Sequence, residues 1–314
     1  MLFNLSERTK GVISKRFGFA GQRETLEAVG QAYGITRERV RQIENDGIVK
    51  LKEAAATPVC QRIFKDYTDY FKNNSGLKRE DLLLAELGGD NFKNYVFFLL
   101  TISNDFIRIT ENEEFHSFWT TDKNLISKAQ KAIETFVLKL EKQKQPMILP
   151  AFLPASYAEI SKNILAGPKG LYGMKNWPEV NPKGIKDKAY IVLKEQEKPL
   201  HFTEVATLIN SSLLFNSKKN VISQTVHNEL IKDPRFVLVG RGLYGLKEWG
   251  YEPGFVRDVI YREIKGSRKP LPEKEIIKRV LNQRMVQPNT ILLNLQNKKY
   301  FVKTPEGMYN IRRA

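Results

Sequence analysis

Residues 25–44 read TLEAVGQAYGITRERVRQIE, and their pattern predicts the structure of the N-terminal domain. Thr25 is placed to cap a short helix whose apolar residues recur at helical spacing. Gly34 supplies a turn, because glycine adopts positive φ at little cost. Thr36 then caps a second helix, whose first turn carries Glu38 beside the positive end of the helix dipole. The stretch therefore predicts a helix-turn-helix.

The outward face of the second helix is polar, with side chains that can read DNA bases. The residues on this face are Arg37, Glu38, Arg41, Gln42 and Asn45. An arginine can pair with guanine, a glutamate can accept from cytosine and a glutamine can pair with adenine. A solvated, salt-bridged helix face is the alternative, but the helix-turn-helix pattern around it favours DNA reading.

The N-terminal residues resemble region 4 of housekeeping bacterial sigma factors. The matching segments are Leu5–Arg8, Lys15–Phe19, Thr25–Gly30, Ile35–Glu44 and Lys50–Lys52. In that family the domain binds the −35 promoter element and docks on the flap of the RNA polymerase β subunit. No aromatic-rich segment precedes residue 5 in this sequence. We therefore expect a sigma-like DNA reader without the part that melts the −10 region.

The resemblance also implies a role for individual residues. Arg37, Glu38 and Gln42 are expected to read −35 bases, and residues 5–19 to face the polymerase flap. Expected phosphate contacts are Arg16, Thr25, Thr36, Arg39 and Arg41. After Glu44 the sequence Asn45-Asp46-Gly47 replaces the basic run that is usual in the family. Because glycine costs about 1 kcal/mol in a helix, we expect the recognition helix to weaken there.

The rest of the chain contains internal repeats. GLYGMKNW at residues 170–177 matches GLYGLKEW at residues 242–249, and residues 307–311 form a weaker third copy. Residues 187–200 and 258–271 also align without a gap. Each repeat predicts helices interrupted by a proline and closed by a β-hairpin with glycines in the turn. Three helices with a hairpin describe a winged helix.

Residues 184–249 resemble the HARE-HTH domain, known from the delta subunit of bacterial RNA polymerase and some chromatin proteins. The resemblance rests on residues 189–193, 198–205 and 235–246. We therefore predict a mainly α fold, with a helix-turn-helix domain followed by tandem winged-helix modules. The predicted segments are 1–56 (sigma region 4-like), 57–120 (a degenerate winged helix), 121–178 (a winged-helix-like repeat), 184–250 (HARE-HTH) and 254–314 (a winged-helix repeat).

The predicted wings differ in charge at their tips. Lys169 and Arg241 occupy equivalent tips and are candidate wing contacts to a phosphate or a minor groove, whereas Glu306 holds that place in the last repeat. Candidate reading helices span residues 221–231 and 290–296, and the second is mostly apolar. Winged helices also dock proteins or act as spacers, and the sequence leaves that alternative open.

Composition restricts the class of protein further. The 314 residues carry a net charge of +16, which favours a polyanionic partner, and residues 251–314 alone carry +8. The single cysteine, Cys60, excludes a disulfide framework, and the three histidines lack metal-ligand spacing. We identify no catalytic motif, and we expect no enzyme activity, metal, cofactor, small-molecule substrate or membrane span.

We therefore expect a cytoplasmic, nucleoid-associated bacterial transcription factor that binds double-stranded promoter DNA and RNA polymerase. A polymerase accessory subunit, delta-like and acting by protein docking, is the alternative. A recognition module of a DNA-processing complex is a third, less favoured hypothesis.

Overall fold

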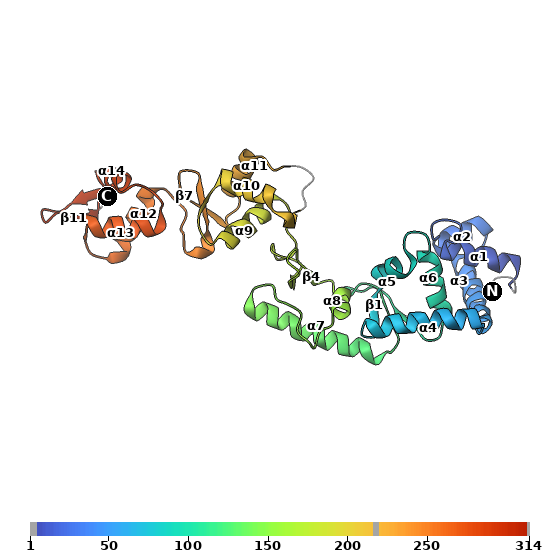
Figure 1. Ribbon diagram of the computed structural model, residues 1–314. Helices are drawn as coiled ribbons and strands as arrows, with labels where there is room; N and C mark the ends of the chain where they lie inside the picture. The colour runs from blue at the N-terminus through green and yellow to red at the C-terminus, as the bar shows by residue number, and fades with distance from the viewer. Residues whose placement is uncertain (1–4, 216–219, 313–314) are drawn as a thin grey trace. The chain divides into compact units, whose positions relative to one another are not determined.

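A computed structural model describes residues 5–215 and 220–312, and this part of the chain is mainly helical with small antiparallel sheets (Figure 1). The chain divides into two compact units, residues 1–175 and 176–314. None of the helices in these ranges is both long and apolar enough to span a bilayer.

Unit 1 begins with the expected helix-turn-helix. Its helices are α1 (Glu7–Phe17), α2 (Leu26–Tyr33) and α3 (Arg37–Ala54). Val12 of α1, Val29 of α2, and Val40 and Ile43 of α3 form a small buried cluster between the three helices. This cluster holds α2 and α3 at their turn and leaves the opposite side of α3 to solvent.

The next segment of unit 1 alternates helices and short strands. Its elements are α4 (Pro58–Asn73), β1 (Leu77–Arg79), α5 (Glu80–Gly88), α6 (Lys93–Ile102), β2 (Ile107–Ile109) and β3 (Phe118–Thr120). The three strands form an antiparallel sheet in the order β1-β3-β2. The element order is thus α-β-α-α-β-β, with the last strand in the middle of the sheet.

The last segment of unit 1 has one helix fewer than the sequence predicts. Between residues 121 and 175 we find α7 (Asn124–Gln143), α8 (Ala155–Ile160) and the paired strands β4 (Ile164–Ala166) and β5 (Tyr172–Met174). An isolated bridge joins Met147 to Tyr172, in the place of a third strand. The expectation of three helices in residues 121–178 is therefore wrong. Residues 148–154, which contain two prolines, form no helix there.

Unit 2 repeats the α-β-α-α-β-β order twice. Its first copy contains α9 (Ile185–Gln196), β6 (Leu200–His201), α10 (Phe202–Ser211), the 3₁₀ turn η2 (Leu213–Phe215), α11 (Ser223–Lys232), β7 (Phe236–Gly240), β8 (Leu243–Leu246) and the 3₁₀ turn η3 (Lys247–Trp249). The sheet order is β6-β8-β7. The predicted reading helix at 221–231 is thus shifted by one or two residues, because α11 starts at Ser223.

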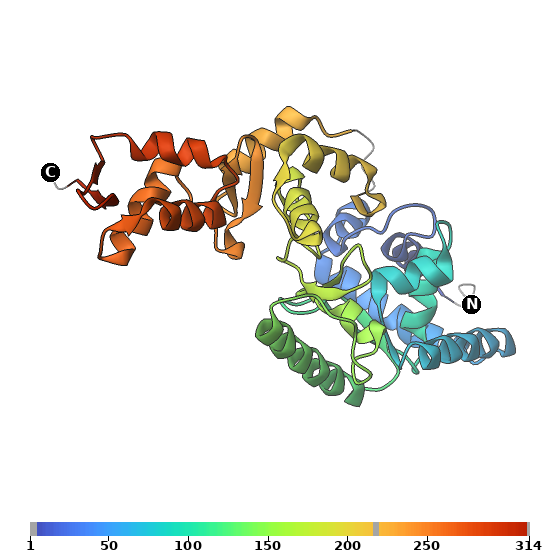
Figure 2. The same ribbon diagram turned by 60° about the vertical axis from the view of Figure 1, so that its left-hand side comes forward.

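The second copy in unit 2 has the same topology. Its elements are α12 (Val256–Ser267), β9 (Leu271–Pro272), α13 (Glu273–Gln283), α14 (Pro288–Leu295), β10 (Phe301–Lys303) and β11 (Met308–Ile311). The sheet order is β10-β11-β9. Both views show the β10–β11 hairpin at the edge of this domain, beside its three helices (Figures 1 and 2).

The two copies in unit 2 have separate buried cores. One is built from α9, α10, α11 and their sheet, around Leu193, Val205 and Leu230. The other is built from α12, α13, α14 and their sheet, around Ile260, Val280 and Ile291. Each core is made by one apolar side of each helix, as expected for amphipathic helices.

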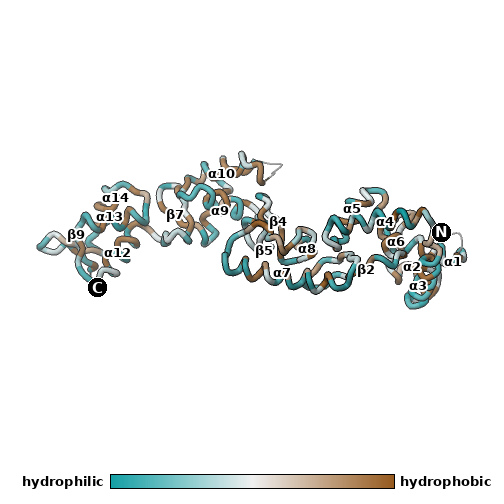
Figure 3. The backbone as a smooth tube through the Cα atoms, turned by 60° about the horizontal axis from the view of Figure 1, so that its bottom comes forward, coloured by the Kyte–Doolittle hydropathy of each residue, from teal (hydrophilic) through white to brown (hydrophobic). Residues whose placement is uncertain are grey.

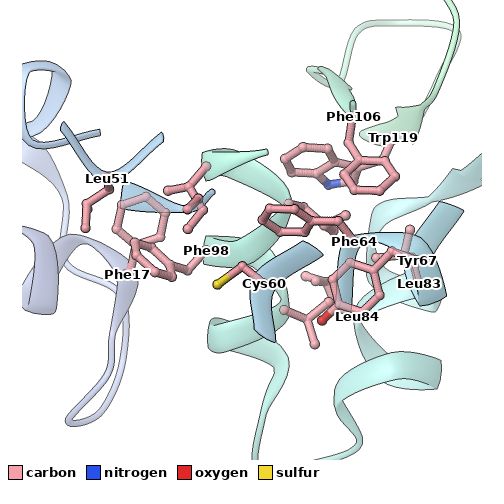
Figure 4. Close-up of a cluster of buried hydrophobic side chains, with 14 of the residues drawn as sticks. Phe17, Leu51, Cys60, Phe64, Tyr67, Leu83, Leu84, Phe98, Phe106 and Trp119 are labelled. Atoms are coloured by element: carbon pink, nitrogen blue, oxygen red, sulfur yellow. The ribbon is translucent and has the colours of Figure 1, made fainter. Parts of the chain in front are cut away.

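Unit 1 differs, because one hydrophobic core contains residues from both sides of the predicted boundary at residue 56. Leu5, Ile13 and Phe17 of the N-terminal part lie in the same cluster as Phe64 and Phe98. Figure 4 shows Phe17 and Leu51 beside Phe98, with Phe64 and Trp119 further along the cluster. Residues 1–56 and 57–120 thus share a core.

The long helix α7 is amphipathic. Hydrophilic and hydrophobic positions alternate along it (Figure 3), and its buried residues are Ala129, Ile133, Phe136 and Leu140.

Candidate nucleic-acid interface

The turn between α2 and α3 has the geometry that the sequence predicts. Thr25 Oγ1 accepts from Ala28 N at 3.1 Å, and Thr36 Oγ1 accepts from Arg39 N at 3.2 Å. Gly34 closes α2 at φ 63°, in the left-handed region. The two caps and the turn are therefore confirmed. Because a cap uses the hydroxyl only as acceptor, each threonine keeps its O–H proton for a further acceptor such as a phosphate oxygen.

The polar face of α3 is exposed over its whole expected length. Its exposed side chains include Arg37, Glu38, Arg41, Gln42 and Asn45, and Arg39 is exposed as well. The structure thus brings the three proposed base readers together on one open helix face. Of the proposed phosphate contacts, Thr36, Arg39 and Arg41 lie at the N-terminal end of α3, and Thr25 caps the N-terminus of α2.

Two pairs of side chains on this face bind each other. Arg41 donates to both carboxylate oxygens of Glu38, at 2.7 and 3.0 Å, and Arg39 Nη1 donates to Gln42 Oε1 at 3.0 Å. The bonds from Arg41 hold the pKa of the Glu38 carboxyl below its ordinary value. Contact of Glu38 or Gln42 with a base therefore requires that these surface pairs open or share their atoms.

Arg37 differs from its neighbours. Its guanidinium forms no hydrogen bond or ion pair with any other residue in the described ranges. It stands in the first turn of α3, next to the Thr36 cap. Of the proposed base readers, Arg37 is the one that needs no existing bond broken before it contacts a base.

Arg16 lies inside the helix-turn-helix domain. Its Nε donates to Glu44 Oε2 of α3 at 2.9 Å, and its Nη1 donates to the backbone oxygen of Glu24. The side chain is 24% exposed and that of Glu44 is 13% exposed. Arg16 therefore links α1, the segment before α2, and α3. A phosphate contact by Arg16 stays a prediction.

The expected weakening of α3 at Gly47 is wrong. The helix continues without a break from Arg37 to Ala54, and Gly47 is buried in it. A Cβ at this position would lie 2.8 Å from Thr9 Cγ2 and 3.3 Å from Ile13 Cγ1, both on α1. The glycine lets α1 and α3 approach closely, so tertiary packing offsets its low helix propensity.

Residues 5–19 were expected to face polymerase, but part of the apolar side of α1 is covered by α6. The ring of Phe17 packs edge-on against Phe98, with centroids 5.1 Å apart, and Phe19 stacks on Tyr95 at 5.1 Å. Asn94 Nδ2 donates to Gly18 O at 2.9 Å, and Arg23 Nε donates to Asn94 Oδ1 at 2.9 Å. Any partner of α1 therefore meets its remaining exposed side, which begins with Glu7 and Arg8.

The wing residues stand at equivalent turns. Lys169 and Arg241 are exposed, and each precedes a glycine with positive φ between two paired strands. Glu306 precedes Gly307 in the turn between β10 and β11. Among the residues that the structure describes, Arg241 forms no hydrogen bond or ion pair.

The two further candidate reading helices differ in character. On α11 the exposed residues include Gln224, Thr225 and Asn228, which are polar and uncharged. On α14, whose bounds are Pro288–Leu295 instead of 290–296, Asn289 is exposed and Leu293 is 60% exposed. Only the first of these surfaces has a row of hydrogen-bonding groups suited to base edges.

The cysteine and two of the histidines pack against other side chains. Within residues 5–215 and 220–312 no group of three His, Cys, Asp or Glu residues is arranged to hold a metal ion. Cys60 is buried in the core of unit 1. The rings of His201 and His227 both pack against the ring of Phe202, each with a centroid distance of 4.4 Å.

Comparison with protein families agrees with both resemblances. The family model of sigma-70 region 4 matches residues 1–53. The family model of the HARE-HTH domain, a helix-turn-helix domain named in part after restriction endonucleases, matches residues 184–249. Both families are helix-turn-helix families that bind DNA. The matches indicate a DNA-binding role connected with transcription.

Proposed function

We propose that the protein reads −35-type promoter DNA through α3 and works with RNA polymerase as a sigma-like transcription factor of the cytoplasm and nucleoid. The exposed face of Arg37, Glu38, Arg41 and Gln42 on a well-formed helix-turn-helix carries this proposal. Arg37 and Gln42 supply bidentate donors and acceptors for guanine and adenine, and Glu38 supplies an acceptor for cytosine. Arg39, Arg41, Thr25 and Thr36 bind flanking phosphates, and Arg16 adds a contact at the edge.

We further infer that the repeated α-β-α-α-β-β segments are winged-helix modules. Their common sheet order, with the last strand in the middle, supports this assignment. In this proposal Arg241 contacts the DNA backbone or minor groove from the wing tip of residues 184–249, and Lys169 does so from the β4–β5 turn, outside the three modules with this order. The row of Gln224, Thr225 and Asn228 on α11 makes residues 184–249 the module best suited to a second contact with bases.

For polymerase, we place the contact on the side of α1 that α6 leaves open. A shallow pocket there is lined by Gly11, Ser14, Lys15, Gln22 and Tyr33, among others. The flap of the polymerase β subunit is the proposed partner, since the matched family docks there. This assignment moves the contact away from Phe17 and Phe19, which are packed against α6.

The first test is fluorescence anisotropy of the full chain on a duplex with a −35 element and on a scrambled duplex, each at two salt concentrations. Base reading predicts a preference for the −35 duplex that persists at the higher salt. Equal affinities that fall together with salt indicate release of counterions alone, and contradict the proposal.

A second candidate function is a polymerase accessory subunit that acts by docking. One observation favours it: α6, the third helix of the module in residues 57–120, lies where a winged helix reads DNA, yet it packs on the chain's own helix-turn-helix. At least this module is thus used for protein contact. Polymerase binding that survives substitution of Arg37 and Gln42 by alanine, without any promoter preference, favours this function.

A further inference from the structure

The acidic side chains of residues 251–312 are mostly engaged by three arginines. Arg257 pairs with Asp258 at 3.0 Å, Arg262 pairs with Glu252, and Arg279 pairs with Glu275 at 2.8 Å and with Glu263 at 3.9 Å. A fourth arginine, Arg284, is buried and donates to backbone oxygens. Within the described residues the other basic side chains form no ion pair: Lys265, Arg268, Lys269, Lys274, Lys278, Lys298, Lys299, Lys303 and Arg312.

The register of the sheet gathers five of these cations at one end. Phe301 of β10 pairs with Ile311 of β11, and Tyr309 of β11 pairs with Leu271 of β9. The residues just before β10, just before β9 and just after β11 therefore lie at the same end of the sheet. These residues are Lys298 and Lys299, Arg268 and Lys269, and Arg312, and together they are called the basic end.

Hydrogen bonds support this placement. Arg312 N donates to Tyr300 O at 2.9 Å, and Arg312 Nη1 donates to Lys298 O at 2.7 Å. All five side chains of the basic end belong to exposed residues. Glu306 lies at the opposite end, in the hairpin turn between β10 and β11. The five cations of the basic end thus lie opposite the wing tip, and Lys303 is the basic residue of β10 on the wing side.

We propose that the basic end binds the phosphate backbone of double-stranded DNA, in a contact that does not depend on sequence. Neighbouring strands are about 4.8 Å apart, so the cations extend over roughly 10 Å across the three strands. DNA presents one charge per about 1.7 Å of helix axis, and neutralising its phosphates releases counterions. This inference rests on DNA being the partner of the chain, and it adds a second, backbone-binding surface far along the sequence from α3.

The surroundings of the basic end favour DNA over a membrane surface. The large apolar side chains that this domain exposes, Phe255, Tyr261, Leu281, Met285, Leu293 and Val302, are on its helices, loops and strand β10 and are not residues of the basic end. Binding to a lipid surface ordinarily adds apolar side chains that enter the bilayer to the attraction of basic residues. At the wing tip of this last module Glu306 would repel phosphate, whereas the module at residues 184–249 has Arg241 at the equivalent place. The proposed phosphate contact of the last module is therefore at the other end of its sheet.

The test compares two triple variants of the full chain that remove the same charge. Lys269→Gln, Lys299→Gln and Arg312→Gln remove three of the five charges of the basic end. Lys274→Gln, Lys278→Gln and Lys303→Gln remove three exposed charges on α13 and β10. All six positions are exposed, so both variants are expected to fold. Binding to a scrambled 30-base-pair duplex is measured by anisotropy across a salt series.

The basic-end variant is expected to bind the scrambled duplex about tenfold more weakly. The slope of log affinity against log salt should fall by roughly 2 to 3, because each lost phosphate contact removes about 0.9. The control variant should stay within about threefold of the unchanged protein. Binding of both variants to vesicles that contain phosphatidylserine is measured in parallel. The proposal is overturned if both variants lose the same affinity for the duplex, or if the basic-end variant loses affinity for the vesicles alone. The ratio of affinities for −35 and scrambled duplexes separately reports base reading by α3.

Discussion

Gly47 in the middle of α3 lies directly against Thr9 and Ile13 of α1. A Cβ at position 47 would come within 2.8 Å of Thr9 Cγ2 and 3.3 Å of Ile13 Cγ1. This contact fixes the distance between α3, the proposed reading helix, and α1 behind it. A residue with low helix propensity thus stands where two helices of the domain pack closely together.

We therefore expect Gly47→Leu to lower the free energy of unfolding of unit 1 by at least about 2 kcal/mol. The leucine has no space between the two helices, and overpacking costs about 1–3 kcal/mol or more. Urea denaturation of the full chain followed by circular dichroism checks this. Asp46→Ala, at the exposed neighbouring position, is the control and should change stability by less than about 0.5 kcal/mol. Equal effects of the two changes would show that the close contact is absent.

The shared core of unit 1 leads to a second prediction. Phe98 is 6% exposed and packs against both Phe17 and Phe19. Phe98→Ala should destabilise α1–α3 and the module at residues 57–120 together, by about 3–5 kcal/mol. Hydrogen exchange of backbone amides should show faster exchange in both segments.

The control for this experiment is Phe92→Ala. Phe92 is 62% exposed and lies just before the same helix, α6. We expect little change of exchange in α1–α3 for this variant. If Phe98→Ala accelerates exchange only within residues 57–120, the two segments fold independently and the shared core has no energetic role.

Local signals in the sequence are sufficient to predict the helix-turn-helix and much of unit 2. Thr25, Gly34 and Thr36 act within three or four residues of chain, so their roles can be predicted from the sequence alone. The repeat of residues 170–177 at 242–249 likewise locates two hairpins. These features depend on neighbours along the chain and not on distant packing.

Features that depend on tertiary contacts could not be predicted in this way. Gly47 is unfavourable by propensity, and only its contact with α1 explains it. The strands β6 and β9 contain two residues each, too few for a pattern of alternation. The gathering of Lys269, Lys299 and Arg312 follows from strand register, which brings together residues far apart along the chain. The covering of α1 by α6 has no local signal at all.

A third prediction concerns the module at residues 184–249. Arg235 Nη2 donates to Asp187 Oδ1 at 2.8 Å and to Asp233 Oδ2 at 2.7 Å, and Asp187 is 8% exposed. Arg235→Met should lower the stability of this module by about 3 kcal/mol, because it leaves the buried carboxylate of Asp187 without its ion-pair partner and with the backbone N–H of Lys183 as its remaining donor. Thermal unfolding checks the change, and Arg235→Met with Asp187→Asn should recover part of the loss.

The same arginine gives this module a pH dependence. Hydrogen bonds from Arg235 hold the pKa of the Asp233 carboxyl below its ordinary value of 3.8. A carboxyl with a lowered pKa in the folded state contributes stability that is present above the ordinary value and is lost as the pH falls through the lowered one. The unchanged protein should therefore lose stability more steeply below about pH 4 than Arg235→Met. Parallel pH profiles of unfolding would contradict this role of Arg235.

The last prediction tests base reading on α3. Arg37 is exposed and forms no hydrogen bond or ion pair with the rest of the described chain, whereas Arg41 is held by Glu38. Arg37→Ala should reduce discrimination between −35 and scrambled duplexes by about 1–3 kcal/mol. Lys50→Ala, also exposed on α3, is the control and should weaken binding to both duplexes by the same factor.

Discrimination should also stay constant between pH 5 and pH 8. Arg41 keeps the pKa of Glu38 below its ordinary value of 4.5, so the carboxylate remains available as an acceptor for cytosine throughout that range.

The Arg37→Ala experiment also has an outcome that contradicts base reading by this residue. If the substitution lowers affinity for both duplexes equally, Arg37 binds phosphate only. Sequence reading must then come from Glu38 and Gln42 or from another module.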